Sequence, residues 1–192
     1  SDAGADHRRL QGFGQRVGVV EDHLQRGPKS CTELAPAVGV HAGALYRLLR
    51  GIASVGVFAE DDQGRFTLTP LATLLLTDGP GSWRAAAILN GKPWVWQPWG
   101  ALAYSVKTGE SAFEHIFGMG VDTYLAQDRA AAETFQAFMQ VATAEEASAV
   151  VPLYDFSGLT AVVDVGGGRG AFLAAILEHN LSLRGILFET AQ

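Results

Sequence analysis

Apolar residues recur with helical spacing in some stretches of this chain and alternate with polar residues in others, which predicts a mixture of helices and strands. In the first helical stretch, at about residues 8–25, the apolar positions are three or four apart: Leu10, Phe13, Val17, Val20 and Leu24. Three glycines within this stretch weaken the helix, so it needs a surface to pack on. That surface is either its own domain or the partner protomer of a dimer.

Residues 30–70 follow the order helix, turn, helix, hairpin, which predicts a winged helix. Thr32 is the expected N-cap of a helix that runs through Ala37. A second helix is expected at about residues 41–55, and the alternating residues 65–69 pair back as a hairpin strand. The apolar face of the second helix is predicted to comprise Leu45, Leu48, Leu49 and Ile52.

The winged helix is also a DNA-binding fold, and its charges decide against that function here. Residues 28–80 hold 4 basic and 5 acidic residues, and the recognition helix would carry only Arg47 and Arg50. The tip of the wing, at residues 60–64, is acidic and would repel phosphates. We therefore expect a structural or dimerising role and no nucleic-acid partner.

Residues 83–152 are predicted to be mainly helical. Four tryptophans lie within 17 residues: Trp83, Trp94, Trp96 and Trp99. They are expected to fill a core where helices cross, the alternative being an aromatic wall for a flat substrate. A long helix at about 129–150 places four apolar residues on one face, which suits either a core or a pocket wall: Phe135, Phe138, Met139 and Ala142.

The strongest chemical signal is a glycine-rich turn after a short apolar run. Residues 159–165 have the Val-rich pattern of a buried parallel strand, and helical spacing resumes at 171–178 before a second strand at 184–189. The glycines between them let the backbone turn sharply and approach a ligand closely: Gly166, Gly167, Gly168 and Gly170. This order is the first half of a nucleotide-binding unit.

Two carboxylates flank this turn. Glu189 lies 19 residues after Gly170, where it can accept both hydroxyl protons of a ribose. Asp164, two residues before the first glycine, fits S-adenosylmethionine better than a dinucleotide, because an acid can orient the turn or face the cationic methionine end. The glycine spacing also matches a dinucleotide site, so an NAD-dependent oxidoreductase stays open as an alternative.

Composition narrows the class of protein further. The 192 residues are 48% hydrophobic and carry a net charge of −6, which argues against a nucleic-acid coat and against adhesion to an acidic membrane. The sequence has neither a membrane-spanning apolar run nor an apolar leader, and we expect no metal site and no membrane partner. The single cysteine, Cys31, is expected to be a small packed residue in a cytoplasmic protein.

With these features the chain resembles the S-adenosylmethionine-dependent O-methyltransferases of the plant caffeic-acid type and their bacterial relatives in natural-product tailoring. The similarity rests on the motif at 162–170, Val-Val-Asp-Val-Gly-Gly-Gly-Arg-Gly, and on the winged-helix segment 45–71. It includes residues 109–113 and the stretch Phe-Gln-Ala-Phe-Met at 135–139. Nearly the whole chain after about residue 10 follows the family's order.

The resemblance implies a mainly α-helical winged-helix dimerisation domain (1–100), a helical linker (101–152) and the first β-α-β of a Rossmann-like α/β domain (153–192). It implies a homodimer and a cofactor, S-adenosyl-L-methionine, bound by six residues: Asp164, Gly166, Gly167, Gly168, Gly170 and Glu189. Phe135 and Met139 would lie near the acceptor, a small aromatic or polyketide-like molecule whose hydroxyl attacks the methyl group by direct displacement.

The family's general-base histidine lies beyond the matched region, and we assign no catalytic residue. None of the five histidines has a matching context: His7, His23, His41, His115 and His179. Two strands and one helix cannot bury both faces of a sheet, so we expect a longer product or another chain to supply the rest. These 192 residues alone are expected to bind cofactor weakly and to be inactive. A non-catalytic winged-helix regulator is a further alternative.

Overall fold

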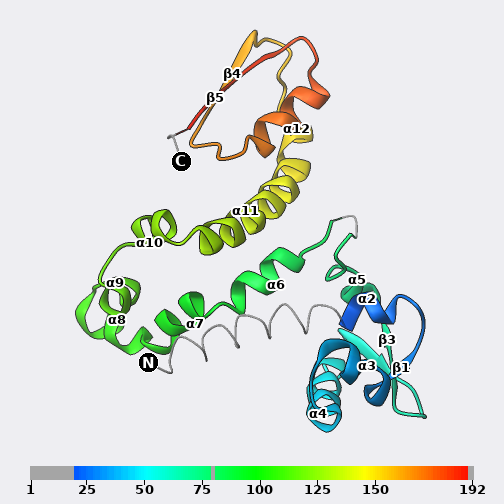
Figure 1. The fold of residues 1–192 in the computed structure, drawn as a ribbon. Helices are drawn as coiled ribbons and strands as arrows, with labels where there is room; N and C mark the ends of the chain where they lie inside the picture. Colours follow the sequence, from blue (N-terminus) through cyan, green and yellow to red (C-terminus); the bar gives the residue numbers. More distant parts are fainter. Residues whose placement is uncertain (1–19, 79–80, 190–192) are drawn as a thin grey trace. The chain divides into compact units, whose positions relative to one another are not determined.

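The computed structural model describes residues 20–78 and 81–189, and these form two units that divide between Trp96 and Gln97 (Figure 1). Most of the helix predicted over 8–25 lies outside the described residues. In the described part of the chain, no helix combines the length and apolar character needed to cross a membrane. The predicted boundaries of three domains stay a prediction.

The first unit is a winged helix, as predicted. Its elements are α2 (Val20–Leu24), β1 (Lys29–Ser30), α3 (Cys31–Val38), α4 (Ala42–Ala53), β2 (Phe58–Glu60), β3 (Arg65–Leu68), α5 (Pro70–Thr73) and α6 (Arg84–Asn90). The strands form an antiparallel sheet in the order β1-β3-β2, with Phe58 opposite Leu68. Phe66, Leu34, Leu49 and Val20 are its largest fully buried side chains. The core therefore lies between the helices and the sheet, and Cys31 is buried in it, as predicted.

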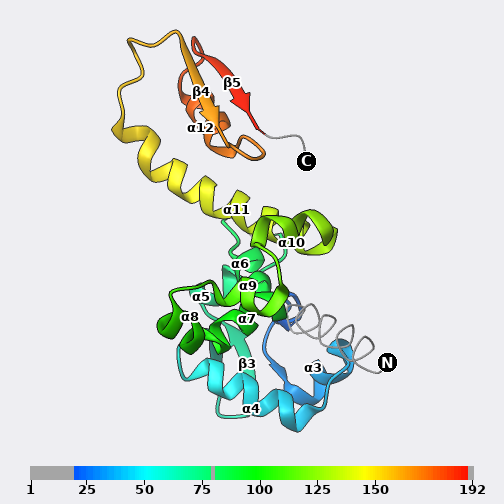
Figure 2. The same ribbon diagram turned by 90° about the vertical axis from the view of Figure 1, so that its left-hand side faces the viewer.

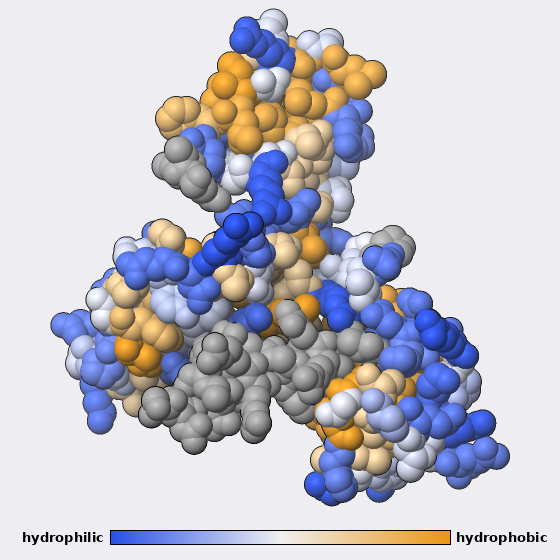
Figure 3. Space-filling model, in the orientation of Figure 1, coloured by the Kyte–Doolittle hydropathy of each residue, from blue (hydrophilic) through white to orange (hydrophobic). Residues whose placement is uncertain are grey.

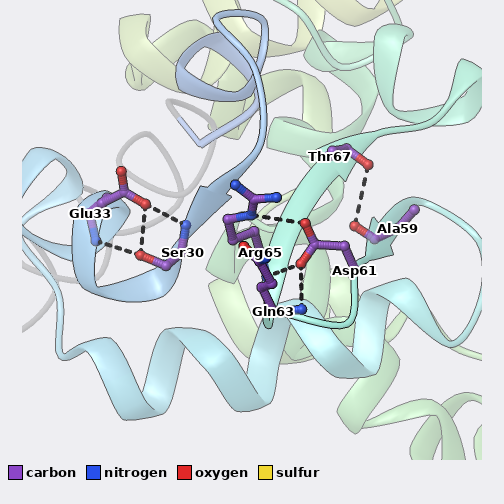
Figure 4. A network of polar contacts seen from close by, with 7 residues as sticks. All are labelled: Ser30, Glu33, Ala59, Asp61, Gln63, Arg65 and Thr67. Carbon is purple, nitrogen blue, oxygen red and sulfur yellow. Dashed lines mark hydrogen bonds and ion pairs between the residues drawn. The ribbon is translucent and has the colours of Figure 1, made fainter.

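Asp61 fixes the turn of the β2–β3 hairpin. Its carboxylate accepts hydrogen bonds from the backbone N–H groups of Gln63 and Arg65, both at 2.9 Å, and from Arg65 Nε at 2.9 Å (Figure 4). The backbone hydrogen bond from Arg65 is the main reason that the pKa of Asp61 is lowered. The acidic character of this turn, noted from sequence, therefore serves in part to hold the hairpin.

The N-cap of α3 is Ser30, and the prediction of Thr32 was wrong. Ser30 Oγ accepts from Glu33 N–H, while the Glu33 carboxylate accepts from Ser30 N–H at 2.8 Å (Figure 4). This reciprocal pair is a capping box, which the Ser-x-x-Glu spacing could have revealed. Thr32 lies inside the first turn, where its hydroxyl contacts Ser30 Oγ at 2.8 Å. At the other end of α3, Gly39 stops the helix in the left-handed conformation.

We expect Ser30→Ala to lower the free energy of unfolding by about 1 kcal/mol, because it removes the cap acceptor and leaves a backbone N–H at the helix start without its partner. Urea denaturation of the chain measures this. Thr32→Ala is the matched control and should cost less than about 0.5 kcal/mol. A larger loss for Thr32→Ala than for Ser30→Ala would contradict the assignment of the cap.

Two predictions about buried helix faces need correction. In α4, Leu45 and Leu49 are buried but Leu48 is 40% exposed, because it lies at the edge of the arc that faces the sheet. The tryptophans do not form one core. In α7 (Pro93–Gly100), Trp94 is buried, whereas Trp96 and Trp99 are 63% and 64% exposed. Residues two and five positions after Trp94 point away from its side of a helix, which is why burial could not include all three.

Glu21 in α2 is the acidic side chain whose burial is costly. It is 6% exposed, and its Oε2 atom has no hydrogen-bond partner among the described residues. Burial raises its pKa above the ordinary value of 4.5, an effect that a backbone hydrogen bond and the charge of Arg84 oppose. The folded chain therefore binds more protons than the unfolded chain between the unfolded and the folded pKa of this group.

We expect this group to make the chain less stable as the pH rises from about 4.5 through the raised pKa of Glu21. Glu21→Gln removes the ionisation, so it should stabilise the chain at neutral pH and weaken the dependence of stability on pH. Urea denaturation at a series of pH values measures both effects. Glu145→Gln, at an exposed position of the long helix, is the control. A Glu21→Gln variant that is less stable than the unsubstituted chain at neutral pH would contradict this reading.

The second unit is built around one long helix and a small parallel sheet (Figure 2). The rest of α7 leads to α8 (Leu102–Thr108), α9 (Ala112–Phe117), α10 (Val121–Gln127), α11 (Arg129–Val150), the 3-10 turn η1 (Val151–Leu153), β4 (Ala161–Val165), α12 (Ala171–His179) and β5 (Arg184–Phe188). The long helix begins and ends where the sequence predicted, with Asp128 as its N-cap. β4 and β5 pair in parallel, so the strand-turn-helix-strand order is confirmed.

One face of this sheet is covered and the other is open. Ile176 of α12 is buried against Ala147 near the end of α11 and against Val151 in η1. The helix α12 packs so closely on β5 that a Cβ at Gly185 would lie 2.6 Å from Leu177 Cδ1. On the opposite face, apolar side chains gather on the surface around β4 and β5 (Figure 3). Four of them are 40% to 72% exposed: Val163, Val165, Ile186 and Phe188. The predicted inability of this β-α-β unit to bury both faces is thus visible.

Candidate functional site

The glycine-rich turn connects the carboxyl end of β4 to the first turn of α12. Gly168 has a φ of +55°, and a Cβ built on it would meet no atom within 4 Å. Its backbone therefore faces open space, and a side chain there would be strained as well as in the way of a ligand. Gly170 also has a positive φ, +76°, and is the N-cap of α12. The turn thus presents bare backbone beside a helix start.

Asp164 supports the turn from below. A Cβ at Gly167 would lie 2.2 Å from Asp164 Oδ2 and 2.7 Å from Leu187 Cδ1, so only glycine fits between the strand ends and the turn. Asp164 Oδ2 is buried without a hydrogen-bond partner among the described residues. The expected role of this acid in orienting the turn stays a prediction.

Glu189 reaches the turn from the end of β5. Its Oε2 atom accepts a hydrogen bond of 2.7 Å from the backbone N–H of Gly168, across 21 residues of sequence. The parallel register explains the approach: Val165 is opposite Phe188, so the residues that follow the two strands emerge at the same edge of the sheet. The carboxylate predicted to face the glycine turn is therefore beside it.

A cavity of about 820 Å³ lies between this turn and the α10–α11 helices. The turn contributes Gly166, Gly167 and Gly168, and Glu189 lines the same space. Phe135 and Met139 of α11, predicted near the acceptor, line it as well. The other two residues of their apolar stripe, Phe138 and Ala142, do not line the cavity, and Met139 is 40% exposed. The role of Phe135 and Met139 at an acceptor site stays a prediction.

Two predicted site residues, Asp164 and Gly170, do not line this cavity and instead support and end the turn. The sequence reasoning missed several polar lining residues: Asp122, Arg129, Gln136, Gln140, Thr143 and Arg169. Four of these lie on α11 at helical spacing with Phe135 and Met139, and this spacing is the signal that could have found them.

An adenosyl cofactor fits these residues. The backbone at Gly166 and Gly168 faces open space, so a ligand can lie against it without meeting a Cβ. Glu189 lies within the same cavity, where a carboxylate can accept from vicinal hydroxyl groups. The volume is in the range of small-molecule sites, about 300–1,000 Å³. The site therefore combines sufficient volume for a small molecule, exposed glycine backbone and a carboxylate that can accept hydrogen bonds from hydroxyl groups.

Comparisons with known proteins agree with this geometry. Residues 19–78 match the O-methyltransferase dimerisation domain, and residues 99–192 match the O-methyltransferase domain. Among curated relatives, phenazine O-methyltransferase PhzM of Lysobacter antibioticus is 42% identical over 91% of this chain and 50% of its own length. Mitomycin biosynthesis 6-O-methyltransferase of Streptomyces lavendulae is 40% identical over 88% of this chain and 49% of its own length.

Solved structures give the same result. Mitomycin 7-O-methyltransferase MmcR superimposes with a TM-score of 0.80 at 38% identity, covering 97% of this chain and 55% of that protein. CalO1, a methyltransferase in calicheamicin biosynthesis solved with S-adenosylhomocysteine bound, superimposes with a TM-score of 0.79 at 34% identity. The match covers 98% of this chain and 56% of that protein. The chain spans about half the length of the relatives it matches. It belongs to the O-methyltransferase family in which a dimerisation domain precedes the methyltransferase domain.

Proposed function

We propose that the whole protein transfers a methyl group from S-adenosylmethionine to a hydroxyl of a small aromatic or polyketide-like natural product. The observation that carries this proposal is the hydrogen bond from Gly168 N–H to Glu189 at 2.7 Å, inside a cavity whose wall includes Phe135 and Met139. The relatives' names, which specify phenazine and mitomycin O-methylation, support an aromatic natural product as the acceptor.

In this proposal the residues divide by chemistry. The backbone of Gly166, Gly167 and Gly168 holds the methionine and ribose part of the cofactor, Glu189 accepts from the ribose hydroxyls, and Asp164 keeps the turn in place. S-adenosylmethionine supplies an electrophilic methyl group. The wall formed by Phe135 and Met139 holds a flat ring, and the chain contributes to rate by positioning the acceptor oxygen. No residue of this chain is assigned as the base that removes the hydroxyl proton.

Calorimetric titration of the whole protein tests the cofactor. We expect S-adenosylhomocysteine to bind and NAD not to bind, which separates this proposal from an oxidoreductase with the same glycine spacing. Mass spectrometry then tests the reaction, with a gain of one methyl group expected on an aromatic hydroxy acceptor. Binding of NAD in preference to S-adenosylhomocysteine, or no transfer to any aromatic hydroxy compound tried, would overturn the proposal.

We also propose that the whole protein is a homodimer joined through its N-terminal domain. The match of residues 19–78 to a dimerisation domain supports this assembly. Light scattering after size-exclusion chromatography is expected to give twice the protomer mass at micromolar concentration. A monomer across the accessible concentration range would contradict it.

A further inference from the structure

The face of α11 that lines the cavity is divided lengthwise into an apolar and a polar edge. At about 100° per residue, Phe135 and Met139 lie together on one side of this face. Gln136, Gln140 and Arg129 lie together on the other side, with Ala132 and Thr143 between the two edges. In Figure 3, hydrophilic side chains gather over α11, next to the apolar surface of the sheet. A ligand in the cavity therefore contacts an apolar edge and a polar edge of the same helix.

The polar edge consists mainly of hydrogen-bond donors that the protein does not use. Arg129 donates from Nε to Glu133 Oε1 at 2.8 Å, and its two terminal amino groups make no hydrogen bond within the described part of the chain. Across residues 20–78 and 81–189, the side-chain amides of Gln136 and Gln140 have no hydrogen-bond partner either. Three side chains on one helix edge thus leave guanidinium and amide N–H groups facing the cavity.

The ion pair of Arg129 does not remove it from ligand binding. The Arg129 and Glu133 side chains are 92% and 59% exposed, so water screens their attraction and the pair contributes little to stability. Glu133 does not line the cavity. A carboxylate that enters the cavity can take both terminal amino groups of the guanidinium in a bidentate geometry, which is the stronger arrangement.

The other charged groups of the cavity are Arg169, Asp122 and Glu189. Glu189 is engaged by Gly168, and Arg169 lies in the glycine turn, beside the proposed cofactor. Asp122 lies on α10, on a different helix from the polar edge. Arg129 is therefore the cationic group on the wall that also carries the apolar edge, where a flat ring would lie.

We propose that Arg129, assisted by Gln136 and Gln140, binds a carboxylate on the acceptor, so that the acceptor is an aromatic hydroxy acid whose ring lies on Phe135 and Met139. This inference rests on the proposed function, since it specifies the substrate class of the same cavity. A carboxylate also occurs on the methionine end of the cofactor, and the experiment must separate these two sources.

The test uses the whole protein. Its affinity for S-adenosylhomocysteine is measured first, and the protein saturated with S-adenosylhomocysteine is then titrated with two probes of similar shape: 4-hydroxybenzoate, which is an anion, and 4-hydroxybenzamide, which is neutral. We expect the benzoate to bind more tightly. Arg129→Gln should weaken benzoate binding about 10-fold to 100-fold, because it removes a charge-assisted hydrogen bond to the carboxylate, and leave benzamide binding within about twofold.

Arg184→Gln is the matched control, because Arg184 is also exposed but lies at the start of β5 and does not line the cavity. It should leave both probes unchanged. Equal binding of the two probes, no binding of either, or an equal effect of Arg129→Gln on both would overturn the inference. If Arg129→Gln weakens S-adenosylhomocysteine instead, the carboxylate belongs to the cofactor, and the inference is also wrong. The affinity of the Arg169→Gln variant for S-adenosylhomocysteine is measured for comparison, because Arg169 lies in the glycine turn beside the proposed cofactor. Failure of S-adenosylhomocysteine to bind the unsubstituted protein would instead count against the proposed function.

Discussion

Gly167→Ala is expected to weaken binding of S-adenosylhomocysteine to the whole protein by about 5-fold to 150-fold, since overpacking costs about 1–3 kcal/mol. The added Cβ would lie 2.2 Å from Asp164 Oδ2 and 2.4 Å from its Cγ, which are distances that no pair of these atoms tolerates. Leu187 Cδ1, at 2.7 Å, blocks the other side. The turn must then move outward, into the space where the ligand's ribose and methionine part is proposed to lie.

Calorimetric titration measures this loss, and thermal unfolding of the same variants shows whether the fold survives. Gly158→Ala is the control, because a Cβ at Gly158 meets no atom within 4 Å and the same chemical change is made in the same unit. It should change neither affinity nor unfolding temperature measurably. A Gly167→Ala variant that binds S-adenosylhomocysteine as the Gly158→Ala variant does would show that the turn is not part of the site.

Glu189→Ala is expected to lower the affinity for S-adenosylhomocysteine by about 10-fold to 100-fold, because a hydrogen bond to a charged group is worth about 1.5–3 kcal/mol. The substitution removes the acceptor that holds Gly168 N–H at 2.7 Å and also the proposed acceptor for the ribose hydroxyls. Glu189→Gln should lose less affinity than Glu189→Ala. Its amide oxygen can still accept the hydrogen bond from Gly168, although the negative charge is gone.

The graded order separates the two roles of this carboxylate. If Glu189→Ala loses affinity for S-adenosylhomocysteine and Glu189→Gln keeps nearly all of it, Glu189 serves the turn alone. If both variants lose affinity, the result supports recognition of the ribose. Glu178→Gln, at an exposed position of α12, is the control for a change in net charge and should leave affinity unaltered. Unchanged affinity in both Glu189 variants would contradict the proposed cofactor site.

The sequence predicted regular elements well where one strong local signal dominated. The α11 helix was predicted at about residues 129–150 from the apolar residues that share one face, and the structure begins it at Arg129 and ends it at Val150. The strand-turn-helix-strand order followed from the glycines after Val165. The α3 cap was missed because Ser30 and Thr32 are both good cap residues, and only the reciprocal bond with Glu33 distinguishes them.

Burial could not be predicted where it depends on which neighbour is present. Leu48, Trp96 and Trp99 are apolar residues on helices, yet each lies on a side that its own unit leaves exposed. Similarly, the stripe containing Phe135 and Met139 fits a core and a pocket wall equally well by spacing alone. Spacing shows which residues share a face but does not show what lies opposite that face.

The sequence by itself therefore determined the winged helix, the long helix, the glycine turn and the family of this chain, because these depend on residues close together along the backbone. Tertiary structure alone decided that Glu189 accepts from Gly168, that Asp164 lies beneath Gly167, and which α11 residues meet in one cavity. Those contacts join residues on different elements. Their geometry is set by the parallel register of β4 and β5 and by the packing of α12, which no local pattern encodes.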